Sequence, residues 1–515
     1  MSRKLVSLVS LSILMGMLSV ALKVQMVRSG GTIYIRADGS IDPPTAPIQR
    51  DGSLYTFTDN VNDSIVVERS NIVIDGEGYM IQGNGSYSGF FLSAISNVTI
   101  KNTNINGFYY GLCLNSTSHS VISGNTITNN SWGIHLKTYS NCNVVIANEI
   151  SSNNDRGIFI LRSYNNTISQ NNVRSNDRHG IVISDSSGNI VYSNKIMANY
   201  DTGINIWTYL KASSHNIIDA NNITMNQNGL DLSRSPNNTI SRNNIANNKF
   251  SGIRFGHSSD NKIHYNNFIN NTHQAWIYTF GTFGIATNIW DKGFPFGGNY
   301  WSDHARNDTY SGSHQNIIDS DGISDTPYII DAYNQDTYPL MGMFSDFNAT
   351  LEYHVTAICN SAISDFQFNG TAIIFNVTGE DGTAGFCRIC IPTALMNDAY
   401  KVFVNGTEVP RSLLQCSNST HRYLYFTYNH STQKAVITSF VQPPPWNLIA
   451  WAGVAVLALG SSFFGYLYLK TRLELKKVHG KIAKISERKS ANICPNCGVQ
   501  NKPEAKFCRK CGKSL

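Results

Sequence analysis

A repeat of about 23 residues limits the possible folds of this chain more than any other sequence feature. Each unit contains a glycine followed by an aliphatic residue, and successive glycines are 22, 24, 23, 23, 26 and 23 residues apart. A second mark, an asparagine followed two positions later by Ile, Val or Phe, keeps the same phase. The marks are Gly111, Gly133, Gly157, Gly180, Gly203, Gly229 and Gly252, with Asn125, Asn148, Asn171, Asn194, Asn221, Asn243 and Asn266. Two phased marks predict a solenoid, in which each unit packs only on its neighbours.

The pattern inside each unit selects the kind of solenoid. Aliphatic and polar residues alternate over only three or four positions, as in Ile204-Asn205-Ile206, which is the period of a short strand. Asparagine, a poor helix former, makes up 13 of residues 141–200. The sequence therefore predicts an all-β protein in which residues 30–345 form a parallel β-helix, right-handed because parallel crossovers usually are.

The repeated asparagines have a structural explanation in such a fold. Equivalent residues of successive units lie one strand spacing apart, about 4.8 Å. Inward amide side chains can therefore hydrogen-bond up and down the stack as a ladder. We expect this structural role for the asparagines, and not the binding of a ligand.

Charge is distributed unevenly along the chain. The formal net charge is +6, from 40 Lys and Arg against 34 Asp and Glu. From Lys470 onward there are 13 basic and 3 acidic residues, so this tail carries +10 and residues 1–469 carry −4. A mildly acidic repeat region does not suit a polyanionic ligand. No nucleic-acid partner is therefore expected.

Both ends of the chain contain membrane signals. Residues 1–25 join a basic start to an apolar run, which predicts a signal peptide or an N-terminal anchor. Residues 448–469 are 22 residues without a charge, long enough for a transmembrane helix. Basic residues follow this segment, whereas residues 435–447 carry no charge. The positive-inside rule then predicts a single-pass protein of the cell membrane, with the large N-terminal part extracytoplasmic and the C-terminal tail cytoplasmic.

A second β domain is expected between the repeats and the membrane. Residues 348–440 contain alternating apolar runs separated by Asn-Gly turns, which predicts a small β-sandwich-like domain. Outside the membrane, Cys359, Cys387, Cys390 and Cys416 are expected to form at least one disulfide, and the pairing stays open.

The C-terminal tail predicts a metal site. A Pro-rich stalk over 441–447 precedes the membrane span, and a basic linker over 470–490 joins it to a tail at 491–515. This tail contains two Cys-x-x-Cys pairs, each followed by glycine. Four thiolates at this spacing are typical of a structural zinc ribbon, whose closed coordination leaves no position for substrate. The predicted zinc ligands are Cys494, Cys497, Cys508 and Cys511. The basic surface of such a ribbon would suit a cytoplasmic protein partner or an acidic membrane face.

A second metal is one interpretation of the segment around Gly322. Asp319, Asp321 and Asp325 alternate with other residues there, as ligands do in a calcium loop. The 12-residue loop with its terminal Glu is missing. Calcium and a hydrogen-bonded Asx-turn cap are therefore the two alternatives.

The repeats also offer a candidate carbohydrate site. Asp155, Asp177 with His179, and Asp201 fall just before the glycines of three consecutive units, and we expect them to stack in one column about 4.8 Å apart. Asp231 lies in an outward position two residues after its glycine. Carboxylates separated by about 5 to 9 Å are what glycoside hydrolysis requires. The alternative is that these are turn residues on a solvated edge, since the motifs of polygalacturonases and alginate epimerases are absent.

Several motifs resemble the archaeal surface branch of the NosD-like β-helix family. The resemblance covers about residues 30–343. It rests on the run Ile65–Gly76, on Asn-Asn-Thr-Ile-Ser at 165–169 and 237–241, and on the segments Gly298–Asp303 and Asp319–Tyr328. It implies a right-handed parallel β-helix, and the family takes its name from a periplasmic protein of copper-enzyme maturation.

The sequence itself gives the copper role no support. The exported part lacks a His-x-His motif, a methionine cluster or a Cys-His pair that would suit copper. Its scattered histidines are expected to be solvated turn residues: His119, His135, His179, His215 and His257.

Three function classes follow from these observations. The anchor, the acidic exterior and the missing enzyme motifs favour a cell-surface protein that binds carbohydrate or acts as a scaffold or adhesin. A polysaccharide hydrolase, lyase or epimerase would need the aspartate column to be a true active site. An accessory role in copper-enzyme maturation is the third class. The binding or scaffold function is the one we predict.

Overall fold

The computed structural model describes residues 31–278, 286–396, 399–439, 492–502 and 505–514. Within these ranges the chain is built from strands, and no helix there is long and apolar enough to cross a membrane. The predicted leader at 1–25, the stalk at 441–447, the span at 448–469 and the linker at 470–490 lie outside the described residues. Two compact units divide the chain, at 1–440 and 441–515.

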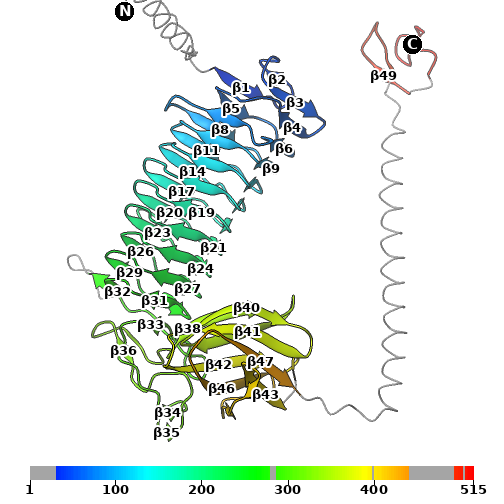
Figure 1. The fold of residues 1–515 in the computed structure, drawn as a ribbon. Coiled ribbons are helices and arrows are strands. Elements are labelled where there is room, and N and C mark those ends of the chain that lie inside the picture. The colour runs from blue at the N-terminus through cyan, green and yellow to red at the C-terminus, as the bar shows by residue number, and fades with distance from the viewer. Residues whose placement is uncertain (1–30, 279–285, 397–398, 440–491, 503–504, 515) are drawn as a thin grey trace, which may run out of the picture. The chain divides into compact units, whose positions relative to one another are not determined.

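The repeats form a parallel β-helix, as predicted (Figure 1). Each turn of the coil, called a rung below, contributes one short strand to each of three long sheets. Sheet A has the order β2 (Ile41–Asp42), β1 (Thr32–Ile35), β5 (Ser64–Val67), β8 (Ser88–Ser93), β11 (Tyr110–Asn115), β14 (Trp132–Lys137), β17 (Arg156–Leu161), β20 (His179–Ser184), β23 (Thr202–Trp207), β26 (Asn228–Ser233), β29 (Ser251–Gly256) and β32 (His273–Tyr278).

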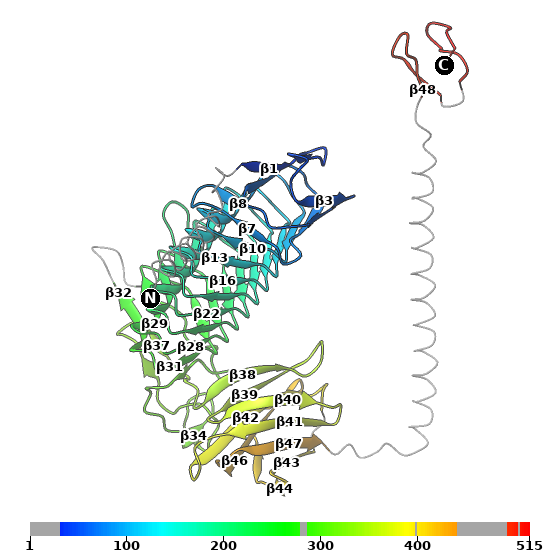
Figure 2. The ribbon, with the colours of Figure 1, turned by 45° about the horizontal axis from the view of Figure 1, so that its top comes forward.

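The other two sheets have shorter strands. Sheet B has the order β3 (Ile48–Asp51), β4 (Leu54–Phe57), β6 (Ile72–Asp75), β9 (Val98–Lys101), β12 (Val121–Ser123), β15 (Val144–Ile146), β18 (Thr167–Ser169), β21 (Ile190–Tyr192), β24 (Ile217–Asp219), β27 (Thr239–Ser241) and β30 (Lys262–His264). Sheet C has the order β33 (Tyr300–Trp301), β31 (Asn267–Ile269), β28 (Asn244–Ala246), β25 (Asn222–Thr224), β22 (Lys195–Met197), β19 (Asn172–Arg174), β16 (Glu149–Ser151), β13 (Thr126–Thr128), β10 (Asn104–Asn106) and β7 (Met80–Gln82). The stack of rungs is seen obliquely in Figure 2.

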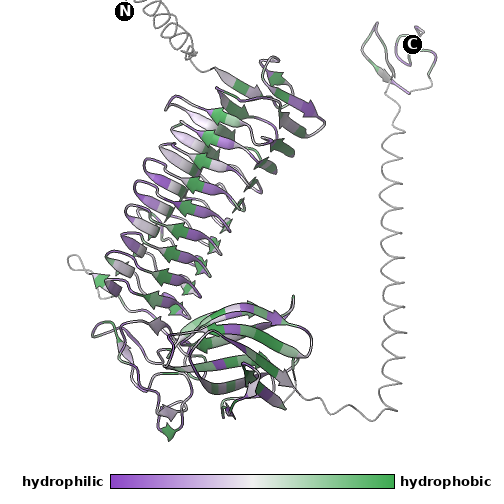
Figure 3. Ribbon diagram, in the orientation of Figure 1, coloured by the Kyte–Doolittle hydropathy of each residue, from purple (hydrophilic) through white to green (hydrophobic). Residues whose placement is uncertain are grey.

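An aliphatic column fills the coil. Ile160, Ile183 and Ile206 follow one another in register on β17, β20 and β23, and all three are fully buried. Along the strands, hydrophobic residues alternate with hydrophilic ones, and the turns are mostly hydrophilic (Figure 3). The repeat glycine is needed because neighbouring rungs approach closely: a Cβ atom at Gly133 would lie 2.4 Å from the carbonyl oxygen of Gly157.

Three asparagine ladders run inside the described part of the coil, one at each turn between sheets. Each side-chain amide donates to the Oδ1 atom of the asparagine in the next rung, at 2.8–3.2 Å. The first ladder comprises Asn125, Asn148, Asn171, Asn194, Asn221, Asn243, Asn266 and Asn299; the second Asn130, Asn153, Asn176, Asn199, Asn226, Asn248 and Asn271; the third Asn143, Asn166, Asn189, Asn216, Asn238, Asn261 and Asn288. The predicted ladder is thus confirmed, and the sequence marks revealed only the first of the three.

Different structures close the two ends of the coil. At the N-terminal end, β1 pairs with β2 and β3 pairs with β4 in antiparallel fashion, which ends both sheets. At the other end, the buried Asp336 carboxylate accepts hydrogen bonds from Asn299 N (2.7 Å) and Trp301 Nε1 (2.9 Å). Burial raises the pKa of Asp336 to about 7. The intervening segment forms two small hairpins: β34 (Tyr310–Ser311) with β35 (Ile317–Ile318), and β36 (Tyr328–Ile329) with β37 (Gln335–Asp336).

A β-sandwich of two antiparallel five-stranded sheets follows the coil. One sheet has the order β38 (Met343–Asn348), β39 (His354–Cys359), β42 (Ala384–Pro392), β46 (His421–Asn429) and β45 (Arg411–Leu413). The other has the order β40 (Ala362–Phe368), β41 (Ala372–Thr378), β47 (Gln433–Ser439), β43 (Tyr400–Val404) and β44 (Thr407–Glu408). The sandwich contacts the last rungs: Asn267 and Phe344 exchange two hydrogen bonds, of 2.7 and 3.0 Å.

The expected disulfide of the sandwich is not formed. All four of its cysteines, which lie in the described residues, are free thiols. Cys359 and Cys387 face each other on β39 and β42, but the Cys359 thiol donates to the Phe386 carbonyl at 3.0 Å and lies 3.3 Å from the Tyr428 hydroxyl. The Cys387 thiol also contacts the Cys359 sulfur, so the two sulfurs are neighbours without being bonded to each other.

Candidate functional site

The outward face of sheet A gathers the residues that the sequence singled out in the repeats. Two columns of outward residues run along it. The inner column lies two residues after each glycine and contains Cys113, His135, Phe159, Val182, Asn205, Asp231, Arg254 and Trp276. The edge column lies directly before each glycine and contains Tyr110, Trp132, Arg156, His179, Thr202, Asn228, Ser251 and His273.

An aromatic cluster covers the N-terminal part of this face. Trp132 packs against Tyr109 and Tyr110, with ring centroids 6.2 and 5.3 Å apart. Trp132 and Phe159 meet edge to face at 5.3 Å. The Arg156 guanidinium lies over both rings, 4.7 Å from the Trp132 centroid and 4.5 Å from that of Phe159. These contacts hold an indole ring and a cation together at a half-buried surface, the combination that recognises flat, hydroxyl-rich ligands by stacking.

His135 is part of the support of this cluster. Its ring stacks on Phe159 at 5.0 Å, with 9° between the planes. Burial lowers its pKa to about 3, and neither ring nitrogen has a hydrogen-bond partner among the described residues. The neutral, buried imidazole packs here as an apolar ring and does not serve as an acid or base.

The prediction of solvated turn histidines is therefore correct for some positions and wrong for two. His119, His215 and His257 occupy turn positions of positive φ, of 53°, 56° and 53°. His135 and His179 are buried in strands of sheet A. The difference arises because outward residues of this sheet are covered by the large side chains of the neighbouring columns.

The predicted aspartate column is only partly correct. Asp155 and Asp201 both stand two residues before their glycines, but the residue at this position in the rung between them is Arg178. Asp177 stands one residue earlier and is exposed. Asp177 N donates to the Asn153 carbonyl as Asn154 N does to the Asn130 carbonyl, so Asp177 is equivalent to Asn154 and not to Asp155.

Basic side chains accompany the acidic groups of the column. The Asp155 carboxylate lies 3.6 Å from Arg156 Nε and 4.0 Å from Arg178 Nη1. His179 Nδ1 lies 3.8 Å from Asp201 Oδ2. Burial lowers the pKa of His179 to about 4 although the Asp201 carboxylate opposes this shift.

Asp231 belongs to a separate group on the same face. Its carboxylate pairs with Arg254 in the next rung and accepts a hydrogen bond from the Tyr278 hydroxyl at 3.2 Å. A guanidinium thus stands beside both Asp155 and Asp231. Asp155 and Asp201 lie two rungs apart, about 9 to 10 Å at the usual strand spacing, with Arg178 between them. Each of these carboxylates therefore has a basic side chain beside it.

Sequence reasoning missed the aromatic cluster. Its signal was nevertheless present, since Tyr110 and Trp132 both stand directly before a repeat glycine. Because both residues have the same position in the repeat, they lie in the same column, one rung apart. The stacking of Arg156 on rings from two rungs could not be predicted from the repeat, because it depends on side-chain conformation.

The aspartates near Gly322 form hydrogen-bonded caps. Asp325 Oδ2 accepts from the Thr309 backbone at 3.0 Å and from its hydroxyl at 2.7 Å, and Asp325 Oδ1 accepts from Tyr310 N at 3.0 Å. Asp321 Oδ1 accepts from Ile323 N at 3.0 Å, and Asp319 Oδ1 from Ser320 N at 2.9 Å. Of the described residues, these aspartates do not form a group that could hold a metal ion. The Asx-turn alternative describes this segment, and the calcium interpretation is not supported.

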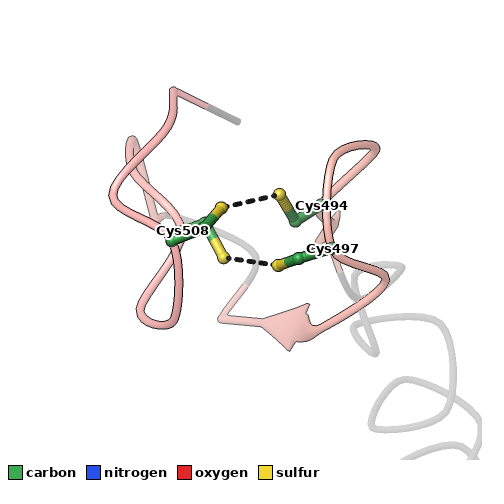
Figure 4. A group of neighbouring side chains, drawn as sticks. Cys494, Cys497 and Cys508 are labelled. Atoms are coloured by element: carbon green, nitrogen blue, oxygen red, sulfur yellow. Dashed lines mark hydrogen bonds between the residues drawn. The ribbon is translucent and has the colours of Figure 1, made fainter.

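Four cysteine sulfurs meet in the C-terminal tail. Cys494 and Cys497 come from one loop and Cys508 from a second, and their sulfurs point toward one another (Figure 4). The four ligand atoms lie within 4.8 Å of one another; Cys494 and Cys511 are 3.6 Å apart, and Cys497 and Cys508 are 3.5 Å apart. Sulfurs bound tetrahedrally at about 2.3 Å from a zinc ion would be about 3.8 Å apart, so the donor set fits this metal.

The backbone around the tail cluster favours thiolates. The N–H groups of Cys511 and Lys510 face the Cys508 sulfur, and they lower the pKa of this thiol to about 6. The strands β48 (Asn492–Ile493) and β49 (Gln500–Asn501) form a hairpin around the first Cys pair. The cluster can therefore hold an ion as a structural centre, while the sheet A face offers a surface for ligands.

Three family models match parts of the chain. Residues 55–210 match a family model described as a right-handed β-helix region, residues 201–305 match the periplasmic copper-binding protein (NosD) model, and residues 493–515 match a zinc-ribbon domain. No curated protein matches the sequence.

Solved structures with a similar coil include several carbohydrate enzymes. The periplasmic alginate epimerase AlgG is 18% identical, with 50% of this chain and 76% of that chain covered and a TM-score of 0.36. The A-module of an Azotobacter vinelandii mannuronan C-5 epimerase is 18% identical, with 53% and 77% covered and a TM-score of 0.36. The DFA-IIIase of Arthrobacter chlorophenolicus is 15% identical, with 53% and 68% covered and a TM-score of 0.31. The chain thus combines a NosD-like right-handed parallel β-helix with a C-terminal zinc-ribbon domain.

Proposed function

We propose that this is a membrane-anchored extracytoplasmic protein that binds a carbohydrate of the cell surface through the outward face of sheet A. The observation that supports this function best is the aromatic cluster, in which Trp132 and Phe159 share the Arg156 guanidinium. A binding role is favoured over hydrolysis, elimination or epimerisation because Asp155 and Asp231 are each held beside a guanidinium. The tail would bind one structural zinc ion in the cytoplasm and serve a protein contact there.

Replacement of Trp132 by Ala should weaken glycan binding by at least tenfold. The truncation of an aromatic anchor at the centre of a contact costs on the order of 2 kcal/mol. The glycan is first identified with the full-length chain on a glycan array, and its Kd is then measured by titration calorimetry. Trp132→Phe keeps a stacking ring and should retain most of the affinity, and Tyr333→Ala removes an exposed ring elsewhere and should have no effect. Equal affinity in the Trp132→Ala protein would exclude the aromatic cluster as the binding site.

The proposed topology can be tested separately. Protease added to intact cells should degrade residues 30–440 and spare residues 470–515, because the basic residues that follow the apolar segment hold this end in the cytoplasm. The fragments are followed with antibodies against each end, and permeabilised cells serve as the control in which both are cut. Loss of the tail epitope in intact cells would contradict this orientation.

A further inference from the structure

A cavity of about 530 Å³ opens at the N-terminal end of the coil. It is lined by the first residues of β1 and β5, by the loop that joins β7 to β8, and by the segment Pro43–Pro47 of the cap. Its volume falls within the usual range of small-molecule sites, about 300 to 1,000 Å³. None of the residues assigned above to the aromatic cluster lines it.

The cavity adjoins the aromatic cluster through Tyr87. Tyr87 lines the cavity and is largely exposed. It stands two residues before Gly89, as Tyr109 does before Gly111. Its carbonyl oxygen accepts hydrogen bonds from Tyr109 N and Tyr110 N, both at 3.1 Å. Tyr87 and Tyr109 therefore occupy the same position in consecutive rungs, and they connect the cavity to Trp132 one rung further on.

Groups that recognise hydroxyls line the cavity. The side-chain amides of Asn62 and Gln82 are exposed and have no hydrogen-bond partner among the described residues. Asp63 uses one carboxylate oxygen to accept from Gly31 N at 2.5 Å, and its second oxygen stays available. Among the described residues, Asp63 is the one charged residue that lines the cavity. Amides together with one carboxylate suit the vicinal hydroxyls of a neutral sugar and disfavour an anionic one.

The cap limits what can occupy this position. The antiparallel strand β2 ends sheet A, and Pro43–Pro47 forms a wall of the cavity. The spacing of the rungs, about 4.8 Å, is close to the advance of one pyranose ring in an extended glycan. A linear glycan that lies along the edge of sheet A can thus place one sugar on each rung, but it cannot continue past the cap.

We infer that the cavity is the terminal subsite of the carbohydrate site and receives the neutral end sugar of a linear polysaccharide. The next sugars lie over Tyr87, Tyr109 and Trp132, one for each rung. This inference rests on the proposed function and adds to it that the protein recognises chain ends. Internal segments of a polymer lack the free terminal ring that fits against Asn62, Asp63 and Gln82.

The length of the polymer distinguishes the two modes of recognition. Short and long chains of linear neutral glucans, mannans and β-linked N-acetylglucosamine are tested with the full-length protein at equal mass. At equal mass, a sample of long chains contains fewer chain ends than a sample of short chains. If the protein recognises ends, long chains should therefore compete less well at the same mass concentration. Competition that depends on mass alone would overturn the inference.

Variants separate this inference from the function on which it rests. Gln82→Ala and Asn62→Ala remove groups without internal partners, so the fold should persist, and each should weaken the binding of short chains by about tenfold. Gln49→Ala, at an exposed position of the cap outside the cavity, is the matched control. If Trp132→Ala abolishes binding while the cavity variants do not change it, the terminal subsite is wrong and the carbohydrate site stands. If no glycan depends on Trp132, both fail.

The charge of the end sugar provides a second readout. A terminal uronic acid should lower the affinity of a short chain by at least tenfold, because its carboxylate would face that of Asp63. Asp63→Asn retains the acceptor for Gly31 N and should reduce this difference. An unchanged preference in the Asp63→Asn protein would contradict the placement of the end sugar.

Discussion

Replacement of Ile183 by Asp should prevent the coil from folding. Ile183 is fully buried between Ile160 and Ile206 of the adjacent rungs, so an ionised carboxylate at this site would lose its hydration without gaining a partner. The cost of such a burial exceeds a typical folding free energy of about 5 to 15 kcal/mol. We expect no cooperative thermal transition and rapid proteolysis throughout the coil.

The same rung supplies a matched control. Ile190 is an outward residue of β21 with 37% of its surface exposed, so Ile190→Asp should fold with nearly unchanged stability. Ile206→Asp should behave as Ile183→Asp does. A cooperative transition near the wild-type temperature in either inward variant would show that the aliphatic column is assigned wrongly.

Replacement of both Cys494 and Cys508 by Ser should abolish zinc binding by the tail. These residues take one sulfur from each Cys-x-x-Cys pair, so two donors remain and the tetrahedral set is lost. A tail of this size buries too little apolar surface to fold by itself, and the metal provides most of its folding free energy. We expect about one zinc ion in each wild-type chain, none in the variant, and increased proteolysis confined to residues 491–515.

An exposed cysteine of the coil provides the control for this experiment. Cys142→Ser removes a thiol that lies outside the four-sulfur cluster and should leave the zinc content unchanged. The thermal transition of the coil should be the same in all three proteins. Wild-type protein without zinc after metal analysis, or a coil destabilised by the tail substitutions, would contradict the separate structural role of the tail.

Regular features of the coil were predictable because each of them recurs with the period of the repeat. The glycine and the first asparagine ladder recur in every unit, and a repeated residue must meet its own copy in the next rung. The asparagines of the second and third ladders share this phase, yet Asn153 and Asn154, or Asn165 and Asn166, stand side by side in the sequence. The sequence alone did not show which of two neighbouring asparagines points inward.

Features that break the repeat were not predictable. Asp177 stands three residues before its glycine, so Arg178 and not Asp177 lies in the column between Asp155 and Asp201. The Asp325 carboxylate accepts from the N–H groups of Thr309 and Tyr310, at the start of the hairpin formed by β34 and β35. In both cases the tertiary structure determines which groups contact the carboxylates. The local sequence pattern of acidic residues, by contrast, resembles that of a binding site.

The direction of the asparagine ladders has a consequence for how the coil is assembled. In the first ladder each amide donates to the next rung toward the C-terminus and also to a backbone carbonyl of the preceding rung. A coil that is still incomplete therefore lacks the ladder acceptor at its last rung. Synthesis proceeds in the same direction, and each new rung brings the acceptor that the preceding rung requires. The first ladder stops at Asp336, whose carboxylate accepts without donating onward. A coil that forms rung by rung in the order of synthesis would therefore pair each ladder donor as the next rung arrives, and the Asp336 carboxylate would complete the first ladder.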